Sequence, residues 1–520
     1  MEIPELPFRP TIPDALRRAA EQWGDGPFIV TPARRMTFAE AERSSRFVAQ
    51  RMLAAGMGKG TRVGLYFTYG QEFVIAWLAA SRIGALVMPF ATTYRPAEIG
   101  KVLRIGDVDT LITASTVLGK DMQQMFEDSV PGLADATGPT LFIPAVPSLR
   151  SIWMTGSTDR AWATPVDLDA EPALPVGIDD KLLAALEAEV FPADLAQVTY
   201  TSGSSADPKG VVHTQGTVLR ATSQLASMVS AEGDRPRYFC AFPFFWIGGT
   251  LVLGAALQSG ATVLCIERFE PGAALDLVEA EQATAVLGWP SLLQAMRDHP
   301  SFRDRTLPDI PSLTVGPADM AIVETPVPGI PQHRGMSETV GNIMSVEHQA
   351  IDPDTGEVQP DLEEGELWVR GYGLMNGYYK KEREEVFDED GWLHTGDRAF
   401  MYEGRPFFVG RFTEMVKSQG ANVSPREVEL FLEETFPEVL YAFVVGIPHP
   451  ERGEEVAAVL VPAKGHEIDP IGLEQRARQQ ISGYKVPTRI EIWQEADVPW
   501  LGSGKPDKLR IKARLAPDAS

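Results

Sequence analysis

The chain has 520 residues, which is long enough for two or more domains. Of these residues 44% are hydrophobic and 23% charged, which is an ordinary composition for a globular protein. Its formal net charge of -24 argues against binding nucleic acid, which needs a basic surface, and against docking on an anionic membrane. Cys240 and Cys265 lie in apolar runs and form no CxxC pair, which predicts buried thiols rather than a zinc site or disulfides. The acidic, proline-containing N-terminus is not a signal peptide, and we expect a cytoplasmic protein.

Strands and helices are predicted to alternate along the first part of the chain. The apolar spacing over 12–24 predicts an amphipathic helix, and Thr37 with Glu40 has the spacing of a capping box that would begin a second helix. The elements expected next are strands over 62–68, 85–90 and 110–113, with helices over 72–83 and 96–105. This alternation predicts parallel βαβ units.

The pattern weakens over 116–190, where no chemistry is assigned, and then a second α/β round begins. The elements expected there are helices over 216–229, 248–257 and 271–281, with strands over 238–245, 261–266 and 285–287. A β-rich section follows over 366–411. The rest has the size of a compact α+β domain, with helices over 425–434 and 473–481 and strands over 441–445, 455–462 and 489–493. We therefore predict an α/β fold with a large domain over 1–412 and a small α+β domain over 413–520.

The stretch YTSGSSADPKGV (200–211) is the clearest local signal of function. An apolar strand leads into hydroxyl residues, a glycine and Lys209. Such a loop offers backbone N–H groups, hydroxyls and one fixed positive charge to an anion such as a polyphosphate, although its spacing is not that of a Walker loop. Taken alone, the stretch is also compatible with an ordinary polar turn, although the phosphate-binding interpretation is favoured.

Several stretches in a fixed order resemble the adenylate-forming superfamily. They are YTSGSSADPKGV (200–211), GMSE (335–338), GELWVRG (365–371), GWLHTGD (391–397), GRFTEMVKSQGANVSPREVE (410–429), YKVP (484–487) and SGK (503–505). YKVP is similar to the acyl-CoA ligase branch. The resemblance implies an enzyme that makes an acyl-adenylate from a carboxylic acid and ATP, releases pyrophosphate, and transfers the acyl group to coenzyme A.

The resemblance also implies nucleotide-binding roles for individual residues. Lys505 would offset charge at the α-phosphate and carboxylate, Ser337 would place a hydroxyl beside the α-phosphate, and Glu338 would bind Mg²⁺ through carboxylate oxygen. Asp397 would accept hydrogen bonds from the ribose hydroxyls, with Arg411 nearby. The remaining predicted nucleotide-binding residues are Thr201, Ser202, Gly203, Ser204, Ser205, Lys209, Arg334, Gly335 and Met336.

Three further groups of residues are implied for the acid, for coenzyme A and for domain movement. The candidates for the acyl pocket are Trp246, Gly248, Gly249, Gly316, Met336 and Gly341, whose apolar or small side chains suit a bulky hydrophobic acid. The candidates for the coenzyme A channel are Ser418, Gln419 and Gly420. Thr413 would be the hinge about which the small domain rotates between the two half-reactions.

Four positions depart from the family pattern. Ala206 stands where the phosphate loop usually has glycine, and Arg334 where an aromatic residue usually stacks on adenine; Trp246 replaces a common histidine, and Thr413 a common Asp or Lys. Because Ala206 and Arg334 fall on ATP-binding positions, a second hypothesis is an enzyme that takes a ready-made acyl-adenylate from a partner adenylating enzyme and catalyses only thioester formation. A loader of carrier proteins and an inactive binding protein are weaker alternatives, since YKVP points away from the former and Lys505 away from the latter.

Overall fold

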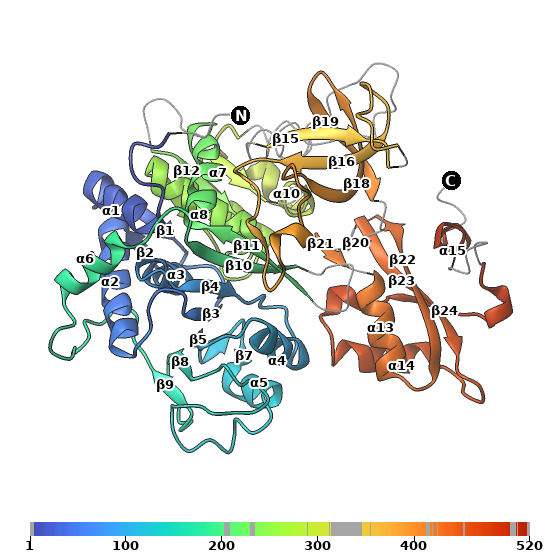
Figure 1. Ribbon diagram of the computed structural model, residues 1–520, viewed down its shortest axis with the longest axis horizontal. Helices are drawn as coiled ribbons and strands as arrows, with labels where there is room; N and C mark the ends of the chain where they lie inside the picture. The colour runs from blue at the N-terminus through green and yellow to red at the C-terminus, as the bar shows by residue number, and fades with distance from the viewer. Residues whose placement is uncertain are drawn as a thin grey trace. The chain divides into compact units, whose positions relative to one another are not determined.

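A computed structural model describes residues 5–201, 208–228, 235–288, 290–310, 313, 346–353, 355–411, 416–418, 420–423, 425–450, 453–499, 506 and 508–516 (Figure 1). The chain forms two compact units. The first comprises 1–92, 100–200 and 210–409, and the second comprises 93–99, 201–209 and 410–520. The predicted boundary and hinge at Thr413 lies outside the described residues and stays a prediction.

The first unit is built on an eight-stranded sheet of order β17-β11-β10-β4-β3-β5-β8-β9. Neighbours from β10 to β9 pair in parallel, and β17 pairs antiparallel with β11. The strands are β3 (Arg62–Tyr66), β4 (Leu86–Pro89), β5 (Thr110–Ala114), β8 (Ser151–Thr155), β9 (Ala163–Pro165), β10 (Leu195–Thr201), β11 (Lys209–Thr214) and β17 (Gly377–Tyr378). The predicted parallel βαβ units are confirmed.

A five-stranded sheet of order β14-β12-β13-β1-β2 holds the second α/β round. Its strands are β1 (Pro27–Val30), β2 (Arg35–Thr37), β12 (Arg237–Cys240), β13 (Thr262–Leu264) and β14 (Ala285–Leu287). The expected strand over 238–245 ends at Cys240, and the aromatic residues after it form the approach to the next helix. Both cysteines are buried and free, as predicted.

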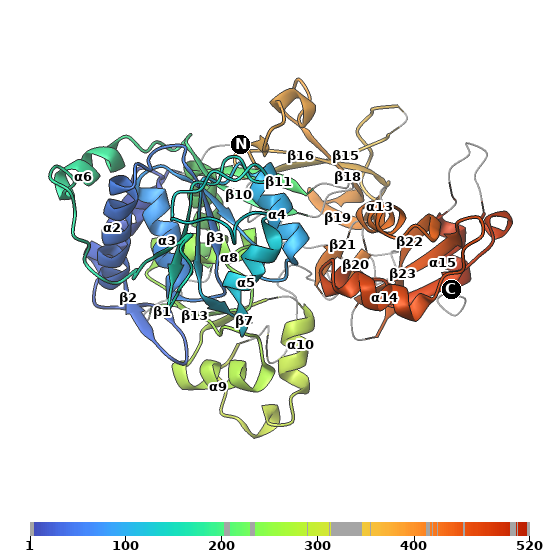
Figure 2. The same ribbon diagram turned by 90° about the horizontal axis from the view of Figure 1, so that it is seen from below.

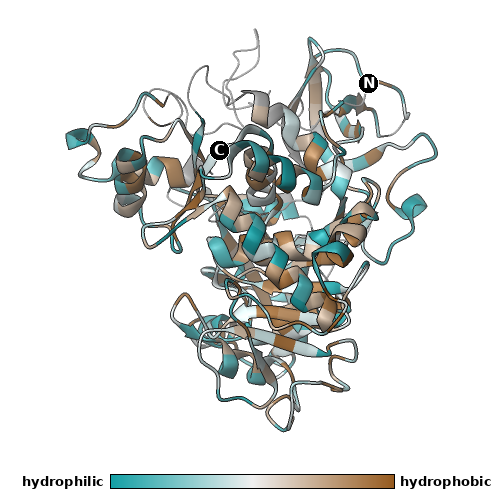
Figure 3. Ribbon diagram, turned by 90° about the vertical axis from the view of Figure 1, so that its left-hand side faces the viewer, coloured by the Kyte–Doolittle hydropathy of each residue, from teal (hydrophilic) through white to brown (hydrophobic). Residues whose placement is uncertain are grey.

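Helices fill the space between the two sheets and cover their outer faces (Figure 2). The helices are α1 (Ile12–Trp23), α2 (Phe38–Ala54), α3 (Gln71–Arg82), α4 (Pro96–Ile105), α5 (Met122–Ser129), α6 (Asp180–Ala188), α7 (Gln215–Met228), α8 (Ile247–Ser259), α9 (Pro271–Glu281) and α10 (Pro290–Asp298), with a 3-10 turn at Phe302–Asp304. One core joins α1, α2, α3 and α8 to strands of both sheets, and a second packs α9 and α10 on the other face of the smaller sheet. Hydrophobic residues accordingly gather on strands and on helices lying against them (Figure 3).

The local signals explain where helices begin and how deeply they are buried. The predicted capping box at the start of α2 is present: the Thr37 hydroxyl accepts from the Glu40 N–H at 3.1 Å, and the Glu40 carboxylate accepts from the Thr37 N–H at 2.8 Å. Phe73 and Trp77 are fully buried in α3, nearly all of whose side chains are inaccessible. A helix that is buried on nearly all sides is packed between layers, and α3 lies in the core that joins the two sheets.

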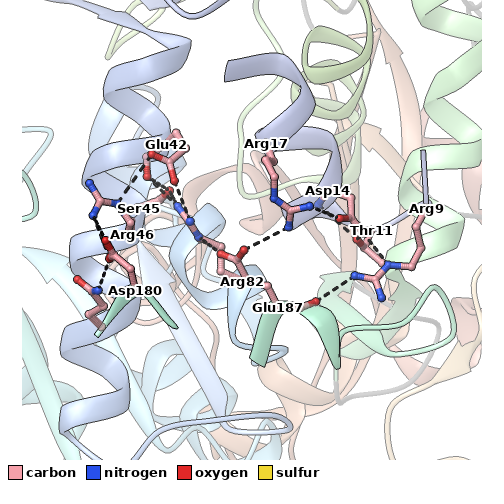
Figure 4. Close-up of polar contacts among 11 residues, drawn as sticks. Arg9, Thr11, Asp14, Arg17, Glu42, Ser45, Arg46, Arg82, Asp180 and Glu187 are labelled. Atoms are coloured by element: carbon pink, nitrogen blue, oxygen red, sulfur yellow. Dashed lines mark hydrogen bonds and ion pairs between the residues drawn. The ribbon is translucent and has the colours of Figure 1, made fainter. Parts of the chain in front are cut away.

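Helix α6 lies in the segment 116–190, where the sequence pattern was weak. Charged side chains attach α6 to the helices around it (Figure 4). Glu187 of α6 pairs with Arg82 of α3 at 2.5 Å and with Arg17 of α1 at 3.3 Å. Asp180, also of α6, pairs with Arg46 of α2 at 3.0 Å. These partners lie more than a hundred residues away in the chain, so the sequence pattern could not reveal them.

The β-rich section of the first unit is an antiparallel sheet of order β15-β16-β18-β19. Its strands are β15 (Glu347–Ile351), β16 (Gly365–Arg370), β18 (Leu393–Tyr402) and β19 (Arg405–Arg411), with a 3-10 turn at Arg383–Glu385. A small hairpin elsewhere in the unit pairs β6 (Thr116–Val117) with β7 (Lys120–Asp121).

The second unit contains a five-stranded sheet with helices on both faces. Its elements are β20 (Val416–Ser418), β21 (Ala421–Val423), α13 (Pro425–Thr435), β22 (Val439–His449), β23 (Gly453–Pro462), α14 (Pro470–Arg478), β24 (Arg489–Ile492) and α15 (Lys508–Leu515), with 3-10 turns at Gly483–Lys485 and Glu495–Asp497. Apolar residues of α13 and α14 pack on one face, and Ile511 and Leu515 of α15 on the other. This is the small α+β fold that the sequence predicted.

Candidate active site

Asp397, the predicted ribose ligand, lies in a β-bulge between β16 and β18. Glu366 pairs with Arg398 and Trp368 pairs with His394, so Leu367 stands opposite three residues of β18 rather than one. Gly396 in the middle of the bulge has φ +71°, which glycine adopts without strain. Bulges interrupt a ladder and turn a side chain out of its regular direction, which is the effect expected at a binding site.

Neighbouring side chains satisfy the backbone groups that the bulge removes from the ladder. The Thr395 hydroxyl donates to the Leu367 carbonyl at 2.7 Å and accepts from the Asp397 N–H at 3.1 Å. The Glu366 carboxylate accepts from the Gly396 N–H at 2.9 Å. The half-buried Asp397 therefore stands on a backbone held on both sides.

The phosphate-type loop is described only at its two ends. It leaves β10 at Thr201 and returns at Lys209, which begins β11 and is half-buried. The Tyr379 N–H donates to the Gly210 carbonyl at 2.7 Å, and a Cβ on Gly210 would lie 2.7 Å from Val198. Gly210 is therefore needed for close packing of β11 on its neighbour, and the strand that leaves the loop is firmly placed.

Three of the residues predicted for the acyl pocket, Trp246, Gly248 and Gly249, lie at the start of α8. Trp246 is the residue before the helix, is half-buried, and meets the Phe245 ring edge-on at 5.7 Å. A Cβ on Gly248 would lie 3.2 Å from the Phe242 ring, whereas one on Gly249 would lie 2.3 Å from the Pro243 carbonyl oxygen. Gly249 is thus required by backbone packing, and Gly248 and Trp246 remain the better candidates for contact with an acid.

Ser418 and Gly420, predicted for the coenzyme A channel, form part of a tight hairpin. Ser418 pairs with Ala421 across β20 and β21 and is buried. Gly420 has φ +76°, so the turn itself requires a glycine there. Lys485 of the YKVP motif is also buried in the second unit, with its ammonium group 2.9 Å from the Glu427 carboxylate of α13. The role of Ser418 and Gly420 toward coenzyme A stays a prediction.

Two family models match the chain over most of its length: an AMP-binding enzyme model over residues 16–328 and an AMP-binding enzyme C-terminal domain model over 427–505. The chain belongs to the AMP-binding enzyme family. It falls in the acyl-CoA ligase branch of the adenylate-forming superfamily, as the ordered motifs predicted.

Curated relatives and solved structures match this AMP-binding enzyme from end to end. It is 29% identical to a putative acyl-CoA synthetase, YngI, of Bacillus subtilis (strain 168), with 97% of each chain covered. It is 29% identical to a feruloyl-CoA synthase of an Amycolatopsis species, with 92% of this chain and 94% of the relative covered. The amide bond synthetase McbA of Marinactinospora thermotolerans has the same fold, with a TM-score of 0.73 at 23% identity, over 96% of this chain and 99% of that one.

Other predicted site residues of this AMP-binding enzyme lie outside the described residues, and their roles stay predictions. They are Ser202, Gly203, Ser204, Ser205, Ala206, Gly316, Arg334, Gly335, Met336, Ser337, Glu338, Gly341, Gln419 and Lys505. For Thr201 and Arg411 the structure describes the backbone alone.

Sequence reasoning missed Glu366, whose carboxylate holds the bulge beside Asp397. The available signal was its place in GELWVRG, next to the GWLHTGD stretch in the ordered set of motifs. A cavity of about 530 Å³ lies elsewhere, lined by Glu72, Thr155 and residues 165–169, and contains no predicted site residue of this AMP-binding enzyme. In the described part of the chain, no helix has the length and apolar character that crossing a membrane requires.

Proposed function

We propose that the protein is an acyl-CoA ligase that converts a bulky hydrophobic carboxylic acid, through its acyl-adenylate, to the coenzyme A thioester. The observation that carries the proposal is the bulge that presents Asp397, a carboxylate on a backbone held by Thr395 and Glu366, within a chain of the AMP-binding family. A carboxylate suits the ribose diol because it accepts hydrogen bonds and donates none.

In the first half-reaction an oxygen of the acid attacks the α-phosphorus of ATP, and the bond to pyrophosphate breaks. Lys505 would offset charge on the attacked phosphorus, the phosphate-type loop with Lys209 would hold the β- and γ-phosphates, and Glu338 would hold Mg²⁺. In the second half-reaction the thiol sulfur of coenzyme A attacks the acyl carbon, loses its proton, and AMP leaves.

The class of acid is inferred from the residues near α8 and from the relatives. Trp246 and Gly248 place an aromatic ring and a small residue side by side at the start of a mainly apolar helix. They supply no charge for a polar substituent on the acid. The relative named feruloyl-CoA synthase supports an aromatic acid as the first substrate to test.

A second candidate function is thioester formation from a ready-made acyl-adenylate supplied by a separate adenylating enzyme. Ala206 in the phosphate loop and Arg334 beside GMSE favour it, because both replace residue types usual at ATP-contacting positions. Neither substitution touches the positions expected for thioester formation.

A paired assay separates the two functions. One arm supplies a panel of hydrophobic acids with ATP, Mg²⁺ and coenzyme A, and the other supplies the matching acyl-adenylates with coenzyme A. Acyl-CoA measured by mass spectrometry in both arms supports the complete ligase, and product from the acyl-adenylate alone supports the second function. Absence of product in both arms would refute both.

Lys505→Ala tests the proposed division of labour between the half-reactions. Loss of a positioned charge at the reacting centre should slow adenylate formation about 100-fold or more, while conversion of the acyl-adenylate continues. Lys464→Ala, at an exposed lysine of the same unit, is the matched control and should leave both arms unchanged. An unchanged first arm in Lys505→Ala would contradict the role given to this residue.

A further inference from the structure

Both oxygens of the Glu366 carboxylate are engaged by N–H donors on the two strands that form the bulge. One oxygen accepts from the Gly396 N–H at 2.9 Å, and the other accepts from the Trp368 indole N–H at 3.1 Å. A carboxylate tied at both oxygens has few alternative rotamers. The direction of the Gly396 N–H is therefore fixed by a side-chain acceptor rather than by a backbone carbonyl of the neighbouring strand.

Trp368 is itself held by a stacked partner from the opposite strand. Its ring lies on the His394 ring with centroids 3.7 Å apart and planes 12° apart, and these two residues are a directly opposed pair of β16 and β18. The His394 ring nitrogen lies 3.2 Å from an oxygen of Asp388. A closed network of contacts (a circuit) thus links these residues: Glu366 is hydrogen-bonded to Trp368, Trp368 is stacked on His394, and Gly396, two residues after His394, is hydrogen-bonded to Glu366.

The circuit matters because the residue before Asp397 is a glycine, which has more backbone freedom than any other residue. Without an acceptor for its N–H, Gly396 has other conformations available, and each would turn the next side chain in another direction. We infer that Glu366, anchored by Trp368, is a positioning residue that sets the direction of the Asp397 carboxylate toward the ribose hydroxyls. This inference rests on the proposed function, in which Asp397 binds the ribose.

Binding of AMP and its deoxy analogues tests the inference without requiring turnover. Calorimetry on the full-length wild-type protein should show AMP binding about tenfold to a hundredfold more tightly than 2′-deoxy-AMP or 3′-deoxy-AMP, the loss expected when a hydrogen bond to a charged group is removed. In Glu366→Ala, AMP should bind about as weakly as the deoxy analogue that binds wild type more weakly. The ratio of the affinity for AMP to the affinity for that analogue should fall toward one. A purely structural role would weaken all three ligands equally and leave the ratio unchanged.

Two further variants keep the test independent of folding. Glu366→Gln retains an oxygen that can accept from Gly396, but its amide NH₂ cannot accept from the Trp368 indole N–H. Its ratio of the affinity for AMP to the affinity for the deoxy analogue should therefore fall below that of wild type and stay above that of Glu366→Ala. Glu363→Ala, at an exposed glutamate in the loop just before β16, should behave as wild type. Thermal unfolding of each variant shows whether it is folded, and Glu366→Gln carries the test if Glu366→Ala is not.

The outcomes separate the inference from the function on which it rests. A wild-type protein that discriminates, with a Glu366→Ala variant (or, if that does not fold, a Glu366→Gln variant) whose ratio is the same, overturns the positioning role and leaves the ribose role of Asp397 intact. A wild-type protein that binds AMP without discriminating, or does not bind it, overturns both the ribose role and the inference.

Discussion

Replacing Arg82 by methionine should release α6 from the helices around it. The Arg82 guanidinium donates to the Glu187 carboxylate at 2.5 Å, to the Glu42 carbonyl at 2.7 Å and carboxylate at 2.9 Å, and to the Ser45 hydroxyl at 3.1 Å (Figure 4). The Arg82 and Glu187 side chains are both only 7% exposed. Methionine fills a similar volume but leaves the buried Glu187 carboxylate without its main partner.

The expected cost follows from this burial. Breaking a buried ion pair by removing one partner costs about 3–5 kcal/mol, because the other charge remains buried. Glu187 keeps Arg17 at 3.3 Å, and the Arg17 side chain is 49% exposed, so we expect the lower end of that range. A cost of about 3 kcal/mol corresponds to roughly a hundredfold change in a local opening equilibrium.

Hydrogen–deuterium exchange of α6 measures this opening directly. In Arg82→Met, amides of α6 should exchange about a hundredfold faster, while those of α13 in the second unit stay unchanged. Arg46→Met is the matched control: its partner Asp180 is 66% exposed, and such a pair contributes about 0–1 kcal/mol. Replacing Glu187 as well as Arg82 by methionine should restore most of the protection. Equal acceleration by Arg82→Met and Arg46→Met would refute the reasoning.

Two further predictions concern buried positions near the candidate site. Burial lowers the pKa of His213 to about 4, against an unfolded value near 6.5, so the unfolded chain takes up the proton first and stability should fall as the pH drops from about 6.5 to about 4. The urea midpoint of unfolding should fall with pH over that range in the wild type and should lose this fall in His213→Gln. A variant whose midpoints depend on pH as those of the wild type do would contradict the role given to His213. Gly249→Ala places a Cβ 2.3 Å from a backbone oxygen and should destabilise by about 1–3 kcal/mol, whereas Gly248→Ala, 3.2 Å from a ring that can move, should cost less. Thermal unfolding of both variants checks the order, and a Gly248→Ala variant as destabilised as Gly249→Ala would contradict the packing argument.

Local chemistry made much of the fold predictable. The capping box at Thr37 and Glu40 begins a helix at the expected residue, and the strand over 285–287 is found with those bounds, because both signals act between residues close in the chain. The ordered motifs likewise identified the family, since they are read from the sequence without any contact. Their roles at Lys505, Glu338 and Arg334 remain predictions.

Other features depend on contacts that no local pattern encodes. The strand expected over 238–245 ends at Cys240, because the chain leaves the sheet there and the following aromatic residues pack before α8. The attachment of α6 depends on partners in α1, α2 and α3, more than a hundred residues away.

The sequence by itself determined the family, the alternation of strands and helices, and the residue types available at the predicted nucleotide-binding positions. Only the tertiary structure decided how Asp397 is presented, because a bulge exists only where two strands pair out of step. It also decided that Glu366 serves that bulge, through a hydrogen bond between residues thirty positions apart. Composition and spacing specify which groups a chain carries, whereas strand register specifies which of them meet.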